Sequence, residues 1–211
     1  MKKLFAFAIS ILLLISLAGC GGSGSGTSNS GTDTNKTDST SNISGSLEEV
    51  TGKIIEKANE TLTGYDKFPT PYNNPVTETN VEGELGLTVE QFKTSVKSAL
   101  SAKDPVMNMA NEIILIECND AAAAADVKKW IIVEGGYDPY KWICAWPEQS
   151  LVITSGQYVF LVSSSVVRAE ALLQAFKDMA GSTGDLTIFF ESDGIGEEGG
   201  IDFTPGPAPL N

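Results

Sequence analysis

Four consecutive aliphatic residues, Ile113–Ile116, lie between Glu112 and Glu117, and this run constrains the fold more than any other segment. Its β-branched composition and short length favour a strand over a helix. A strand without alternation between apolar and polar residues is expected to be buried on both faces, so other elements must cover its sheet. We therefore predict a doubly buried strand over 112–118.

Helix signals lie on both sides of this strand. Ser46 and Thr88 each begin a capping box, the pattern that marks a helix N-terminus. Apolar residues at helical spacing then predict helices over 46–62 and 88–100. Asp120 can cap a further helix through its side-chain oxygen. The alanine run that follows it favours this helix, because alanine has the highest intrinsic helix propensity.

The remaining segments complete an α+β pattern. Prolines predict a loop over 65–75 and a short helix over 138–146, which begins at Pro139 and stops before Pro147. A glycine turn predicts a hairpin over 151–162, and helical spacing predicts a last helix that Gly181 ends. The fold class predicted is α+β, with a small, mainly antiparallel sheet packed by several helices.

The N-terminus carries a targeting signal. Lys2 and Lys3 precede an apolar run over 4–17, which is short for a membrane span. The run ends in Leu17-Ala18-Gly19-Cys20, which resembles the lipobox of bacterial lipoproteins. This resemblance implies cleavage of signal peptide 1–19 between Gly19 and Cys20, with diacylation of the Cys20 thiol. The alternative is an ordinary secretory signal with an incidental cysteine.

Residues 20–45 are almost entirely Gly, Ser, Thr and Asn. Such a segment buries too little apolar surface to offset its ordering entropy, so it is predicted to be a flexible tether. The lipid on Cys20 would then hold a domain over 46–181 at the extracytoplasmic face of the cell membrane. Residues 182–211 contain a possible extra strand over 186–190 and an acidic, Gly- and Pro-rich tail.

Composition excludes several classes of partner and chemistry. The chain has net charge −13, which becomes −15 when Lys2 and Lys3 are removed with the signal peptide. Nucleic acid is therefore a poor partner, because its phosphates repel an acidic protein. The chain has no histidine, which excludes Ser-His-Asp and Cys-His catalytic pairs and histidine-ligated metals. No cofactor is predicted.

The order of elements resembles a known family. The strand at 112–118, a helix with Val127-Lys128-Lys129, an aromatic segment over 137–142, the hairpin around Gly156 and a closing helix with Phe176 are similar to domain-of-unknown-function family 4358. The similarity covers about residues 105–181. It implies a short lipoprotein of Gram-positive bacteria, and it carries over no functional residues because the family has no assigned activity.

Aromatic side chains are the strongest candidates for ligand binding. Tyr140, Trp142 and Trp146 lie in the densest aromatic group of the chain, and Trp142 and Trp146 would share one face of the helix predicted over 138–146. On a surface these rings could stack on a sugar or a peptide. Otherwise they pack the helices against the sheet, and solvent exposure decides between the two.

Three other groups of residues are weaker candidates. The carboxylates of Glu112, Glu117 and Asp120 could in principle form an acid–base pair for a glycosidic bond. Cys118 and Cys144 could form a disulfide outside the membrane, or each could act as a small apolar side chain.

The tail from Glu191 to Asp202 partly matches a calcium loop. Asp193, Gly196 and Asp202 fit the template, but glutamate at its first position and Ile195 at its fifth do not. An acidic tail without metal is the better interpretation.

These patterns predict a membrane-anchored extracellular lipoprotein whose domain binds an envelope protein or a cell-wall ligand without catalysis. The alternatives are a carboxylate-dependent hydrolase of envelope polysaccharide and a structural or assembly lipoprotein.

Overall fold

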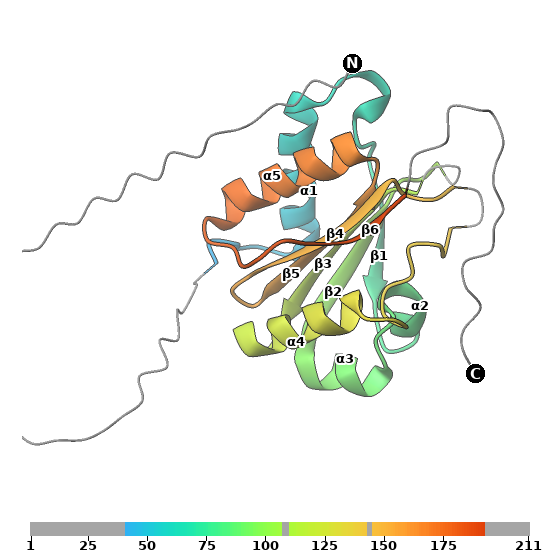
Figure 1. The fold of residues 1–211 in the computed structure, drawn as a ribbon. Coiled ribbons are helices and arrows are strands. Elements are labelled where there is room, and N and C mark those ends of the chain that lie inside the picture. The colour runs from blue at the N-terminus through green and yellow to red at the C-terminus, as the bar shows by residue number, and fades with distance from the viewer. Residues whose placement is uncertain (1–40, 107–109, 143–144, 193–211) are drawn as a thin grey trace, which may run out of the picture. The chain divides into compact units, whose positions relative to one another are not determined.

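The computed structural model describes residues 41–106, 110–142 and 145–192, and it forms a six-stranded antiparallel sheet with helices on both faces (Figure 1). The strand order is β1-β2-β3-β5-β4-β6. The strands are β1 (Tyr72–Val76), β2 (Val96–Lys103), β3 (Glu112–Cys118), β4 (Gln149–Ser155), β5 (Tyr158–Ser164) and β6 (Thr187–Glu191). The helices are α1 (Leu47–Thr61), the 3₁₀ turn η1 (Gly64–Asp66), α2 (Val81–Leu85), α3 (Val89–Ser95), α4 (Ala121–Ile132) and α5 (Val166–Ala180).

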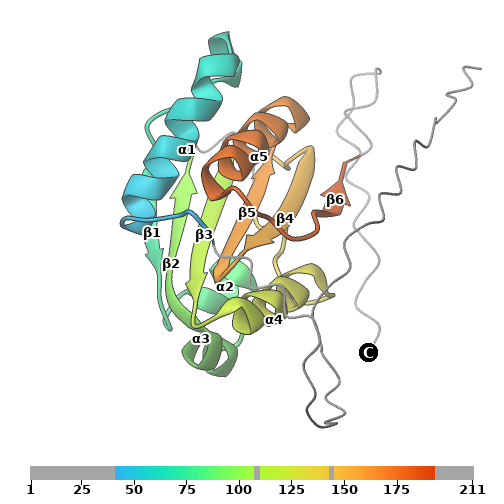
Figure 2. The ribbon, with the colours of Figure 1, turned by 90° about the vertical axis from the view of Figure 1, so that its left-hand side faces the viewer.

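The sheet divides the core into two layers (Figure 2). Helices α1 and α5 cover one face, where Phe160 of β5 stacks on Phe176 of α5 with ring centroids 4.4 Å apart. Helices α2, α3 and α4 lie on the other face. Ile113 and Leu115 point to the first layer, and Ile114 and Ile116 point to the second. This confirms the predicted α+β class and the doubly buried strand.

Several local predictions are also confirmed. The Ser46 and Thr88 capping boxes both form, and the Asp120 carboxylate accepts a hydrogen bond from the Ala123 amide at the start of α4. The predicted hairpin is β4–β5, and Gly181 follows the last residue of α5. The extra strand of the tail is β6, which pairs with β4 at one edge of the same sheet.

The helix predicted over 88–100 is wrong in its second half. Helix α3 ends at Ser95, and Val96 begins β2. Val96 and Leu100 fit helical spacing, but a register shift between Val96 and Ser98 pairs Val96 with Cys118 and Leu100 with Leu115, so the two residues lie on opposite faces of β2. Pairing of β2 with β3 on one side and β1 on the other decides for the strand, since these pairings satisfy its backbone.

Two further predictions need correction. The predicted loop over 65–75 contains β1, an edge strand in which Pro75 is tolerated because it lacks only an outward-facing amide. The predicted helix over 138–146 is absent from its described residues, 138–142 and 145–146. A single turn forms there, in which the Asp138 carboxylate accepts from the Tyr140 amide, and it does not propagate into a helix.

The folded domain begins slightly before Ser46. Ile43 is buried in the first layer, and the Asn42 amide donates to the Ala180 carbonyl at the end of α5. The adjoining segment also contacts the β4–β5 turn, because the Gly184 amide donates to Thr154. The polypeptide therefore enters the domain at the end of the sheet where this hairpin turns, the side of the blue segment in Figure 1.

Candidate functional site

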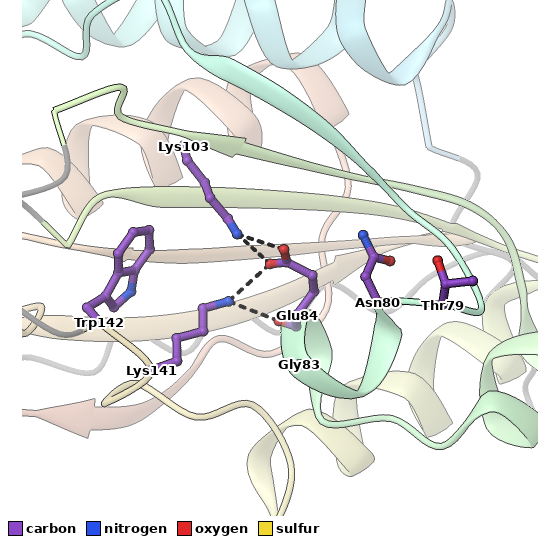
Figure 3. A pocket seen from close by; sticks show the side chains of 7 residues that line it. All are labelled: Thr79, Asn80, Gly83, Glu84, Lys103, Lys141 and Trp142. Atoms are coloured by element: carbon purple, nitrogen blue, oxygen red, sulfur yellow. Dashed lines mark hydrogen bonds and ion pairs between the residues drawn. The ribbon is translucent and has the colours of Figure 1, made fainter.

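Two carboxylates and two ammonium groups meet at the other end of the sheet, and Figure 3 shows three of these residues, Glu84, Lys103 and Lys141. Lys103, the last residue of β2, lies 2.7 Å from Glu84 of α2 and 3.7 Å from Glu112 of β3. Lys141 lies 2.7 Å from Glu112 and 3.4 Å from Glu84. We call these four residues the charge network. It ties α2, two strands and the segment 137–142 together.

Glu112 is the buried centre of this network. Its side chain is fully buried, and it accepts hydrogen bonds from the Ser101 hydroxyl at 2.6 Å and the Tyr137 hydroxyl at 2.7 Å. Burial, together with the charge of Glu112, raises the pKa of Tyr137 well above its usual value. Tyr137 is therefore a neutral hydrogen-bond donor, and Glu112 has partners for both of its oxygens.

A shallow pocket of about 410 Å³ lies beside the charge network. Figure 3 shows its lining residues, which are Thr79, Asn80, Gly83, Glu84, Lys103, Lys141 and Trp142. Most polar groups here are already engaged. The Lys141 ammonium donates to the Glu84 carbonyl and forms ion pairs with the Glu84 and Glu112 carboxylates. The Asn80 amide accepts from the Thr77 amide and donates to the Pro75 carbonyl. The two positive and two negative charges cancel. The pocket is therefore built mainly as a structural junction.

Two glycines allow this junction to close. Gly86 ends α2 at φ +70°, a backbone conformation that favours glycine. A Cβ at Gly86 would lie 1.9 Å from the carbonyl oxygen of Gly136, and a Cβ at Gly136 would lie 2.3 Å from the carbonyl of Trp130. Glycine at position 86 lets the end of α2 contact the chain at Gly136, and glycine at position 136 lets the chain pass close to the last turn of α4.

Replacement of Glu84 by glutamine is expected to change how stability depends on pH. Burial alone would raise the pKa of Glu84, but hydrogen bonds and charges from Lys103 and Lys141 outweigh it and lower the pKa below 4.5. As the pH falls below that value, the unfolded chain takes up a proton that the folded chain does not, so stability is lost. Urea unfolding between about pH 7 and pH 3 should show wild type and Glu84→Gln converging in acid. A constant difference at every pH would contradict the role of the Glu84 charge.

The carboxylates proposed for hydrolysis do not come together. Glu112 and Glu117 lie at opposite ends of β3, about 17 Å apart at 3.4 Å per residue, and on opposite faces. Asp120 is the N-cap of α4. The carboxylate that does lie near Glu112 is Glu84, since both have an oxygen within 3.4 Å of the Lys141 nitrogen and so lie no more than about 6.1 Å apart. Ammonium groups fill the space between them that a glycosidic bond would need.

The aromatic prediction divides between two places. Tyr140 and Trp146 pack edge to face with ring centroids 5.4 Å apart, and Tyr140 packs in the same way on Phe190 of β6 at 5.1 Å. Tyr140 is 55% exposed and Trp146 is 47% exposed. We call these three residues the aromatic cluster. Trp142 does not join it, because its ring lies in the pocket near the Lys103 ammonium.

The aromatic cluster and the charge network share one row of the sheet. The row runs through paired residues of all six strands: Tyr72, Lys103, Glu112, Ser163, Ser150 and Phe190. Neither Phe190 nor Glu84 was predicted to be a site residue. For Phe190 a signal existed, since it lies in a predicted strand; for Glu84 no local pattern indicates that α2 reaches Lys103 and Lys141.

The other candidate residues give limited information. Cys118 is buried, and burial together with the Asp120 and Glu117 charges raises the pKa of its thiol to about 12, so it is a poor nucleophile. Its predicted partner Cys144 lies outside the described residues, and the disulfide stays a prediction.

The predicted calcium ligands Asp193, Gly196 and Asp202, the cleavage residue Gly19 and the lipidation residue Cys20 also lie outside the described part of the chain. Within residues 41–106, 110–142 and 145–192, no three acidic or cysteine side chains are grouped to hold a metal ion.

Comparison with known proteins adds no assignment. No family model, no curated protein and no solved structure matches the chain. The similarity to domain-of-unknown-function family 4358 over about residues 105–181 therefore stays a prediction.

Proposed function

We propose that this protein is a lipoprotein held at the extracytoplasmic face of the cell membrane by acylated Cys20, and that its domain binds an envelope partner without catalysis. The observation that carries the binding role is the exposure of Tyr140 and Trp146 in a cluster with Phe190. Large rings exposed together, rather than singly, are typical of interaction surfaces.

The placement of the cluster supports this role. The polypeptide enters the domain beside Ala180 and the β4–β5 turn, whereas Phe190 pairs with Ser150 at the opposite end of β4. Five residues of extended chain separate Ser150 from Ser155, which corresponds to about 17 Å. The point where the chain enters the domain therefore does not cover the aromatic cluster. In the part of the chain that the structure describes, no helix is long and apolar enough to cross a bilayer.

Removal of two rings from the cluster is expected to abolish partner capture. A Tyr140→Ala, Trp146→Ala double variant should recover at least about tenfold less partner from native envelope, because hot-spot aromatics contribute about 1.4 kcal/mol or more each. The matched control is Tyr65→Ala, Tyr72→Ala, which removes two tyrosines that are 97% and 63% exposed and belong to no cluster. Quantitative mass spectrometry of the captured proteins measures the ratio.

If the two double variants unfold at the same urea concentration and still recover equal amounts of partner, the aromatic cluster is not the binding surface.

The lipid anchor has its own test. Intact-mass measurement of the native protein should find the chain beginning at Cys20 with a diacylglyceryl group. A chain without lipid, recovered only from the medium, would contradict the membrane location.

A further inference from the structure

The two edges of the sheet differ in how they are protected. β1 carries Pro75 and two asparagines, features that hinder pairing with another chain. β6 has the sequence Thr-Ile-Phe-Phe-Glu, with no proline and no lysine. Within the described residues β6 pairs with β4 alone, and Ile188 is 45% exposed on it. The edge at β6 can therefore accept a further strand, whereas the edge at β1 is poorly suited to it.

The surface around this edge is acidic. Asp138, Glu148 and Glu191 are exposed and lie within two residues of Tyr140, Trp146 and Phe190, respectively. The nearby cations are engaged elsewhere. Lys141 is held in the charge network, and the Lys128 ammonium donates to the Asp185 carbonyl before β6 begins. A cationic partner would meet unpaired negative charge here, and its ammonium or guanidinium groups could also lie over the exposed rings.

We infer that the free edge of β6 and the adjoining aromatic cluster form a docking site for an extended basic peptide segment of a partner protein, which adds as a seventh strand to the sheet. This inference rests on the proposed function and specifies its partner. Backbone hydrogen bonds to β6 would supply much of the affinity. Alternate side chains of the added strand would point toward the aromatic cluster and toward Ile188. Phe190 and Ile188 lie on opposite faces of the sheet because a register shift pairs them with the adjacent residues Ser150 and Leu151 of β4.

Charge argues against the other occupants. A second copy of this domain would bring the same carboxylates of Glu148 and Glu191 against themselves across a two-fold axis. Residues 193–211 of the chain contain four acidic residues and no lysine or arginine. Both would be repelled at this edge, whereas a basic segment of another protein would be attracted.

Synthetic peptides test the inference on the full acylated protein in detergent micelles. The probes are six-residue peptides in which lysine alternates with valine, isoleucine or tyrosine. The first control set carries glutamate in place of lysine, and the second carries N-methyl groups on alternate backbone nitrogens, which removes the donors of one strand edge. Fluorescence anisotropy of labelled peptides measures affinity, and sedimentation measures the oligomeric state.

We expect at least one lysine peptide to bind the wild-type protein with at least tenfold higher affinity than its glutamate and N-methyl analogues. The same lysine peptide should bind the Trp146→Ala variant with about tenfold lower affinity than it binds the wild type. Equal binding of glutamate peptides would overturn the basic partner, and equal binding of N-methyl peptides would overturn strand addition. A dimer that lysine peptides do not dissociate would identify a second copy as the occupant. If no lysine peptide binds while envelope capture still depends on Tyr140 and Trp146, this inference fails and the proposed function stands. If no lysine peptide binds and envelope capture does not depend on Tyr140 and Trp146, the inference and the proposed function both fail.

Discussion

Replacement of Arg168 by methionine is expected to lower the free energy of unfolding by about 3–5 kcal/mol, one of the largest effects of any single substitution considered for this domain. Arg168 is on α5 and is only 2% exposed. Its guanidinium donates to the carbonyls of Tyr65, Asp66 and Lys67 at 2.6, 2.8 and 3.2 Å. These three carbonyls belong to η1 and the residue after it, which lead from α1 toward β1.

Methionine fills similar volume but provides no donor, so the three carbonyl acceptors of these part-buried hydrogen bonds would lose their partner together. The Asp104 carboxylate, 3.9 Å from the guanidinium, would lose its nearest positive charge. Urea unfolding measures the change. The control is Lys177→Met on the same helix, which removes a partly exposed cation and should change stability by less than about 0.5 kcal/mol. Equal effects of the two substitutions would show that Arg168 does not hold η1.

The second large effect is expected in the charge network. Lys141→Met leaves the buried Glu112 carboxylate with Lys103 at 3.7 Å as its only ion-pair partner, and Glu112→Gln leaves two ammonium groups with one carboxylate. Each change should cost about 3–5 kcal/mol, because each leaves charge uncompensated away from water. The double variant removes one charge of each sign, so it should cost clearly less than the two single effects added together.

The exposed pair Lys97–Glu117 is the matched control for this cycle. It also joins β2 to β3, with 3.5 Å between the charged atoms, but its side chains are 46% and 27% exposed. Lys97→Met and Glu117→Gln should each cost less than about 1 kcal/mol. Strict additivity at Lys141 and Glu112, or an equal cost at the control pair, would contradict the account of a buried network.

Much of the fold could be predicted because local and long-range signals agree. The apolar run of β3, the capping boxes at Ser46 and Thr88 and the glycine turn between β4 and β5 each have a single physical explanation. The prediction failed at 96–100, where Val96 and Leu100 continue the helical spacing and only pairing with β1 and β3 makes the segment a strand. It failed again at 138–146, where one turn forms but side-chain contacts to distant strands take over.

The candidate site could be predicted only in part. Tyr140, Trp142 and Trp146 were selected for residue type, and Trp142 and Trp146 were expected to share a helix face. In the structure Trp142 lines the pocket, and Trp146 packs on Tyr140 instead. Phe190 joins them through the pairing of β6 with β4, which places residues 50 positions apart in sequence side by side. Glu84 and Lys141 meet through packing of α2, which no pattern of spacing encodes.

Site-specific photocrosslinking in living cells tests most directly whether the aromatic cluster is a binding surface. A photoreactive phenylalanine derivative is placed at position 140, where an aromatic ring is retained, and at position 65, where Tyr65 is 97% exposed but isolated. The account predicts a discrete covalent adduct with one envelope protein from position 140 and none from position 65. No adduct at position 140, or the same set of adducts at both positions, would contradict it.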